Sequence, residues 1–275
     1  KANTIRCMSR SFFRYVLLGL VIAGGGCEQP RQQEPNADVE GITLADLKSE
    51  QQGPGHSFFS FTMLTYGVDA AAVDKLAEVI DSLSQQHIDY ADAEAFEANG
   101  FAVGCGGPEE ATSIVQKLRA LGAVRIGRGV LMTPPGSHEI LHAENVIGPS
   151  AVIYSTSQSG FGGASLPAGK IGWVISARDD TETAAAGRVS LCPAFWQIGN
   201  RTLRLVAGQE PFQFDFFDVG RIHFSMKPRE FCLLGPERVV RDQNTLDRFL
   251  FQTYAGGKLR FFVIVFEGRR GIDGD

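Results

Sequence analysis

Apolar residues recur at helical spacing in two stretches of the first half of the chain. They predict helices over 70–83, after an N-capping Asp69, and over 108–122. Asn99-Gly100 closes a shorter predicted helix over 93–98. Runs rich in aromatic and β-branched residues predict strands over 58–66, 101–104 and 123–133. We therefore expect residues 57–149 to form a small α/β unit.

From about residue 150 the pattern changes to short apolar or alternating runs separated by turn residues, which is typical of antiparallel hairpins. These runs cover 151–157, 170–177, 188–196, 212–217, 221–226 and 230–235. A helix near 245–253 precedes the most apolar run, 259–266, which we expect to be central and buried on both faces. The predicted fold class is α+β. Residues 150–275 are its mostly antiparallel β portion, either separate from residues 57–149 or continuous with them.

An apolar run near the start of the chain has the layout of a secretory signal. Arg10 and Arg14 give a positive segment, residues 15–23 are apolar, and three glycines precede Cys27. A membrane-spanning helix needs roughly 20 apolar residues, so this short run predicts a signal peptide over 1–26. Met8 is the sensible start, and residues 1–7 are excluded from the fold prediction.

Because small residues precede a cysteine, Gly24-Gly25-Gly26-Cys27 resembles the bacterial lipoprotein signal. The resemblance implies that Cys27 is acylated, for example with palmitate, and becomes the first residue of the mature chain. It also implies a lipid anchor in a membrane of the bacterial cell envelope, facing the periplasm or the exterior. The alternative is a plain secretion signal in which Cys27 is incidental.

Composition and charge narrow the range of partners. Residues 27–56 are rich in Pro, Gln, Glu, Asn and Asp, and they predict a flexible stalk. Loss of the signal peptide would change the net charge from −5 to −9, which argues against nucleic acid because phosphate recognition needs a basic face. We expect the protein to contact the membrane through its lipid anchor. Its possible protein partners are envelope proteins or further copies of this chain.

Three cysteines remain in the predicted domain: Cys105, Cys192 and Cys232. An odd number in an oxidising compartment permits at most one disulfide and one free thiol, and the sequence leaves the pairing open. The chain has no C-x-x-C pair that would indicate a thiol-redox centre or a zinc ribbon.

Residues 138–142 read His-Glu-Ile-Leu-His, the H-E-x-x-H motif of zinc hydrolases. On a helix this spacing lets His138 and His142 bind zinc while Glu139 polarises the attacking water. Here Pro-Pro-Gly-Ser directly precedes the motif, and the third ligand would have to be a distant residue such as Glu182 or Glu210. We expect a surface loop or hairpin that happens to contain the motif, with no metal or cofactor. A zinc-dependent hydrolase, with His138 and His142 as ligands and Glu139 as catalytic residue, is the alternative.

Gly104-Cys105-Gly106-Gly107 lies between a predicted strand and a predicted helix, the position of a phosphate-binding turn. Glu109 and Glu110 follow in the expected first helical turn and would repel a phosphate. We therefore expect these glycines to serve a tight turn.

Two further groups could carry chemistry. The acidic pairs Asp179-Asp180 and Asp215/Asp218 could bind a cation or act as acid and base, but we expect solvated turns and strand faces. An aromatic cluster is expected to be core rather than a ligand platform: Phe212, Phe214, Phe216, Phe217 and Phe224.

In the last third of the chain, three segments stand in a suggestive order: 230–235 (EFCLLG), 244–250 (NTLDRFL) and 259–265 (LRFFVIV). This order resembles the end of bacterial secretin barrels, and residues 188–195 (RVSLCPAF) are similar to the paired barrel strand. The resemblance implies a β-rich domain derived from, or assembling with, an envelope complex, without implying a working pore.

The main functional hypothesis is a lipid-anchored envelope protein with a non-enzymatic binding or assembly domain. The sequence has neither a G-x-S-x-G elbow nor an S-x-x-K motif, which favours binding over catalysis. The zinc-dependent hydrolase remains the alternative.

Overall fold

The computed structural model describes residues 57–84, 88–181, 186–197, 214–239, 244–252 and 257–271. By their contacts, residues Gln52–Asp275 form one compact unit, which is the part of the chain considered below. The predicted signal peptide, Cys27 and the stalk lie outside the described residues, as do Glu182, Glu210 and Phe212.

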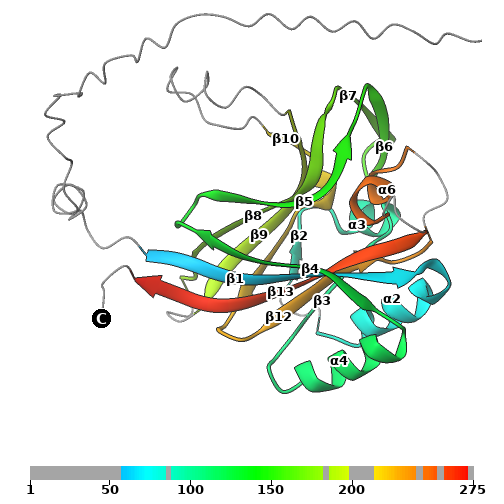
Figure 1. Cartoon of the computed structure of the whole chain (residues 1–275). Helices are drawn as coiled ribbons and strands as arrows, with labels where there is room; N and C mark the ends of the chain where they lie inside the picture. The colour runs from blue at the N-terminus through cyan, green and yellow to red at the C-terminus, as the bar shows by residue number, and fades with distance from the viewer. Residues whose placement is uncertain are drawn as a thin grey trace, which may run out of the picture. The chain divides into compact units, whose positions relative to one another are not determined.

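The described strands are antiparallel and build two main sheets (Figure 1). The five-stranded sheet has the order β3 (Phe101–Gly106), β12 (Phe231–Pro236), β13 (Lys258–Gly271), β1 (Ser57–Asp69) and β4 (Val124–Thr133). The six-stranded sheet has the order β2 (Ile88–Tyr90), β11 (Ile222–Met226), β9 (Gly187–Trp196), β8 (Gly169–Asp179) and β5 (His138–Val146), and β10 (Phe214–Phe216) also pairs with β9. A separate hairpin joins β6 (Ser150–Thr156) to β7 (Gly160–Leu166).

The predicted α+β class is confirmed, with β-structure dominating. Both main sheets combine strands from the first and second halves of the chain. β1, β3 and β4 lie in one sheet with β12 and β13, and β2 and β5 lie in the other with β8, β9 and β11. The segment that is similar to the paired secretin strand forms β9. It lies in the six-stranded sheet, whereas β12 and β13 lie in the other.

The main core lies between the two sheets, and a second core lies on the opposite face of the five-stranded sheet under α2 (Val73–Asp81) and α4 (Ala111–Ala120). Side chains of β13 alternate between these cores. Phe262, Ile264 and Phe266 face the other sheet, while Leu259, Phe261 and Val263 face the helices. The prediction that this run is central and buried on both faces is therefore confirmed.

The predicted helices exist with shifted starts. A 3-10 turn over Ala70–Ala72 precedes α2, and the Asp69 side chain makes no capping hydrogen bond. α4 begins at Ala111 rather than near Pro108, because Glu110 folds back and its Oε2 accepts a hydrogen bond from Gly107 N at 2.9 Å. α3 (Ala93–Ala98) matches its prediction, capped by Asp92, which accepts from Ala95 N. The last predicted helix is α6 (Leu246–Phe251).

Three strands were not predicted: β2, β5 and β7. β2 has three residues and β7 is rich in glycine, so neither carries a strand pattern of its own. Each forms because a neighbouring strand supplies hydrogen-bond partners, β11 for β2 and β6 for β7.

Candidate functional site

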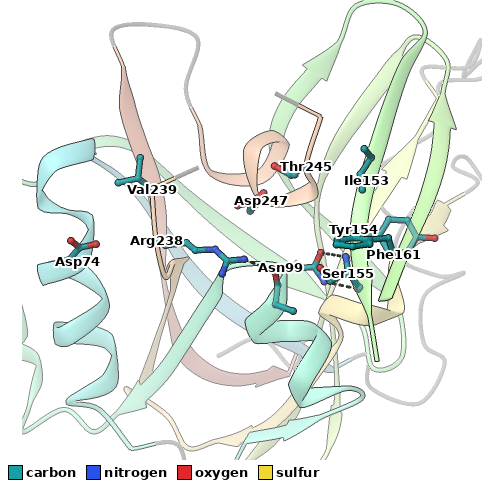
Figure 2. Close-up of a pocket in the computed structure, with 11 residues that line it drawn as sticks. Asp74, Asn99, Ile153, Tyr154, Ser155, Phe161, Arg238, Val239, Thr245 and Asp247 are labelled. Atoms are coloured by element: carbon teal, nitrogen blue, oxygen red, sulfur yellow. Dashed lines mark hydrogen bonds between the residues drawn. The ribbon is translucent and has the colours of Figure 1, made fainter. Parts of the chain in front are cut away.

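A pocket of about 430 Å³ opens where several segments of the described chain meet (Figure 2). Its walls come from α2, the end of α3, the β6–β7 hairpin, the residues that follow β12 and the start of α6. A concave site at the junction of several elements is the usual location of a ligand site.

Asn99 fixes one wall of the pocket by joining the end of α3 to the edge of β6. Its Nδ2 donates to Ser155 O at 2.9 Å, and its Oδ1 accepts from Ser155 N at 2.8 Å. The carboxamide therefore takes both backbone hydrogen bonds of Ser155, as a neighbouring strand would. Ile153 N, two residues earlier, donates to Asn244 O at 2.7 Å. These bonds occupy this edge of β6, so recognition in the pocket falls to side chains.

Arg238 faces this wall and is held at the C-terminal end of α3. Its Nη2 donates to Ala98 O at 2.6 Å, where the helix carbonyls favour a positive charge. Gly100 has φ of +71°, and a Cβ there would lie 3.2 Å from both Arg238 Nε and Asp247 Oδ2. Glycine thus lets both charged groups approach the chain. Since a guanidinium has five N–H donors, others remain available to a ligand.

Asp247 of α6 also lines the pocket and is 7% exposed. Burial raises the pKa of its carboxyl, while hydrogen bonds from Thr245 and Arg248 N and the positive charge of Arg238 act in the opposite direction. A carboxyl that resists ionisation repels an incoming anion less than an exposed carboxylate would.

Apolar side chains surround these polar groups and remain accessible. Ile153, Phe161 and Val239 are exposed, Phe161 by 74%. Beside them Tyr154 packs edge-to-face on Phe217, with ring centroids 5.5 Å apart. Exposed apolar groups around a few fixed polar groups are typical of a binding site.

The pocket therefore combines a fixed cation, a buried carboxyl and accessible apolar walls, with Asp74 of α2 on the far side. Hydrogen bonds hold Asn99, Arg238 and Asp247 in place, and the Thr245 side chain donates to the Asp247 carboxyl. The arrangement suits binding of an amphipathic anion.

The H-E-x-x-H sequence lies on strand β5, so the expectation of a surface loop is wrong. His138 pairs with Ser176, and His142 with Gly172, along β8. Residues four apart on a strand are separated by about 13 Å, against about 6 Å along a helix. On strand β5, His138 and His142 therefore lack the helical spacing that would bring both of them to one zinc ion. Glu139 faces the core side of β5, and burial raises the pKa of its carboxyl.

His138 is exposed and belongs to an aromatic group on the outer face of the six-stranded sheet. Its ring centroid lies 6.4 Å from that of Phe214 and 6.0 Å from that of Phe216. Arg221 lies over Phe216, 5.3 Å from the ring centroid. The expectation of a core cluster is confirmed for Phe217 and Phe224 but wrong for Phe216, which remains exposed because β10 lies along the edge of β9. Across the described ranges, no group of three or more His, Cys, Asp or Glu side chains could hold a metal ion.

The glycine run serves close packing rather than a tight turn. Gly104 and Gly106 lie within β3, and a Cβ at Gly104 would be only 2.4 Å from Ile80 O of α2. Gly107 N donates to the Glu110 carboxylate. The Glu110 carboxylate therefore occupies a backbone N–H group that a bound phosphate would need as a hydrogen-bond donor.

The acidic pairs behave as solvated surface groups where the structure describes their partners. Asp179 forms an exposed ion pair with Arg269, 2.7 Å apart, and Asp218 forms one with Arg221. Exposed pairs of this kind contribute little to stability.

The sequence did not single out the residues that form the pocket. The sequence pattern marks Asn99 only as a helix end and assigns no role to Arg238, Asp247 or Phe161. A usable signal existed in the polar run around Arg238 between two apolar elements, since conspicuous loop residues often carry function.

No protein-family model matches this chain, and no curated protein matches it in sequence. Within the described part of the chain, no helix is long and apolar enough to cross a membrane.

Proposed function

We propose that this protein is a non-enzymatic binding domain of the bacterial cell envelope, anchored through a lipid on Cys27, and that its pocket binds an amphipathic ligand with a carboxylate group. The observation that carries the proposal is the placement of Arg238, whose guanidinium is fixed by Ala98 O beside exposed apolar side chains.

Each part of the pocket has a role in this proposal. A carboxylate accepts charge-assisted hydrogen bonds from Arg238, which presents its donors in a fixed fork. An apolar group of the ligand packs on Ile153 and Phe161. Asp74 on the opposite wall can accept a hydrogen bond from a ligand N–H group. A short peptide segment with a free carboxyl end supplies all three features, which agrees with an envelope protein as partner.

The zinc-hydrolase alternative receives no support from this geometry, because the two histidines lie on a strand.

The test uses acetyl-Phe-Leu with a free carboxylate, and the same dipeptide as its C-terminal amide, in NMR titrations of the protein. We expect the carboxylate form to shift resonances of Ile153 and Phe161. The affinity of the amide form should be lower by a factor of about 10 or more, because it loses a charged hydrogen bond. Arg238→Gln should reduce binding by a similar factor. The matched control is Arg128→Gln, an arginine on exposed β4.

Equal affinity for acid and amide, or unchanged affinity in Arg238→Gln, would overturn the assignment of the ligand. For the anchor, Cys27→Ala should abolish acyl labelling and release the protein from membranes. A variant that stays labelled and membrane-bound would refute the anchor.

A further inference from the structure

Two of the three cysteines of the domain lie directly opposite each other on neighbouring strands. Cys105 of β3 is paired with Cys232 of β12 in the antiparallel ladder. Opposite residues in such a ladder project their side chains to the same face, and both cysteines lie in the core between the sheets.

The backbone hydrogen bonds show which kind of pair this is. Ser84 N donates to Cys105 O, and Cys105 N donates to Ser84 O, each at 3.1 Å. In a strand the N–H and C=O of one residue point to the same side, so both groups of Cys105 point away from Cys232. The two cysteines therefore form a non-hydrogen-bonded pair, in which the Cα atoms are about 4.5 Å apart.

This geometry is within the range of a disulfide, whose Cα atoms lie about 4.4 to 6.8 Å apart. The neighbouring Cys105 thiol adds to the burial that raises the pKa of Cys232. Cys192 lies in the six-stranded sheet, where its Sγ is 3.7 Å from Phe217 O.

We propose that Cys105 and Cys232 form a cross-strand disulfide, so that this pair is a redox-modification site and Cys192 is the free thiol. The proposal rests on strand register alone and does not depend on the ligand proposed for the pocket.

Oxidation requires an external disulfide, supplied by a small molecule or by a thiol–disulfide exchange protein. The Cys105 thiolate, which is half-buried, attacks one sulfur of that disulfide, and the other sulfur leaves and takes a proton. The Cys232 thiolate then attacks Cys105 Sγ and releases the second half as a thiol. Two protein thiols become one disulfide while one external disulfide becomes two thiols. Burial raises the pKa of Cys232, which slows the second step.

The crosslink would fix the ladder that leads to the pocket. At the far end of this ladder, Phe101 of β3 is paired with Pro236 of β12. Asn99 comes two residues before Phe101, and Arg238 comes two residues after Pro236. The disulfide would therefore hold together the two strands that carry the polar groups of the pocket. It also closes a long loop, which restricts the unfolded chain.

The experiment is peptide mapping of the full chain after incubation with glutathione disulfide. Free thiols are blocked with N-ethylmaleimide before digestion without reductant. Trypsin places Cys105, Cys192 and Cys232 on three different peptides, 76–117, 189–201 and 230–238. We expect 76–117 linked to 230–238, with Cys192 alkylated only after unfolding. Cys192→Ser should keep the link and Cys105→Ser should remove it.

A second measurement covers variants that fold poorly. Reduction with dithiothreitol should lower the melting temperature of the wild-type protein by about 5 to 10 °C, and leave that of Cys105→Ser unchanged. Alkylation of both Cys105 and Cys232 after oxidation, or a native link that involves Cys192, would overturn the proposal.

Discussion

The two edge strands of the five-stranded sheet differ in how they are covered. β3 lies under α2 and faces the other sheet, and Phe101, Ala102 and Val103 are all buried. β4 carries exposed apolar side chains at every second position near its ends: Val124, Ile126, Val130 and Met132. In the described part of the chain β4 pairs only with β1, so its outer edge has no partner strand. Alternation in a sequence shows which residues share a face, but not whether anything covers that face.

The largest expected contrast is between an aromatic residue on β3 and an aliphatic one on β4. Phe101 is 2% exposed and contacts Phe96, Trp173 and Phe251, with ring centroids 5.3, 5.6 and 5.8 Å apart. Phe101→Ala should lower the free energy of unfolding by about 3 to 5 kcal/mol, because it leaves a cavity. Val130→Ala, at a side chain that is 59% exposed, should change it by less than about 0.5 kcal/mol. Urea unfolding of both variants measures this, and similar costs would mean that β4 is covered in solution.

Glycines sharpen the same comparison. A Cβ at Gly104 of β3 would lie 2.4 Å from Ile80 O and 2.9 Å from Leu83 Cβ, so Gly104→Ala must push α2 away at a cost of about 1 to 3 kcal/mol. A Cβ at Gly129 of β4 meets nothing within 4 Å. Gly129→Ala should be neutral or stabilising by up to about 1 kcal/mol, since glycine weakens a strand. A destabilised Gly129→Ala would show that β4 is confined.

Strong apolar patterns predicted elements that the core selects: the most apolar run predicted β13, and helical spacing predicted α2. The sequence also placed β12 and β9 correctly as strands, since each is apolar along its length. It failed at β5, because His138 to Val146 is mostly polar and becomes a strand only by pairing with β8. The pocket was missed for a related reason. Asn99, Arg238 and Asp247 come from three separate segments, and only the folded ladder of β3 and β12 brings them together.

Charge distinguishes the two edges as well. Asp247 lies beside Gly100, just before β3, and burial raises the pKa of its carboxyl, whereas the charged residues of β4 are both arginines, Arg125 and Arg128. A carboxyl whose folded-state pKa is raised stabilises the fold fully below its unfolded pKa, and this stability is lost as pH rises through the folded pKa. The melting temperature of Asp247→Asn should therefore rise relative to that of the wild type as the pH increases from about 4 to 7.

The control for this titration is Arg128→Gln, whose difference from wild type should not change over the same range, because arginine stays charged. Thermal scans at several pH values measure both variants. A pH-independent difference for Asp247→Asn would contradict the assignment of a raised pKa.

The smallest effect on stability is expected at β4, where a change should instead be seen in association. Val130→Lys should alter the free energy of unfolding by less than about 0.5 kcal/mol, because the side chain already faces solvent. An unpaired strand with an apolar face readily pairs with another chain, and a lysine on it opposes that pairing. Light scattering at fixed protein concentration should then show slower aggregation, or a smaller assembly if copies of the chain join through β4. Unchanged scattering would mean that self-association does not use this edge, while a large loss of stability would mean that the strand is buried in the assembled protein.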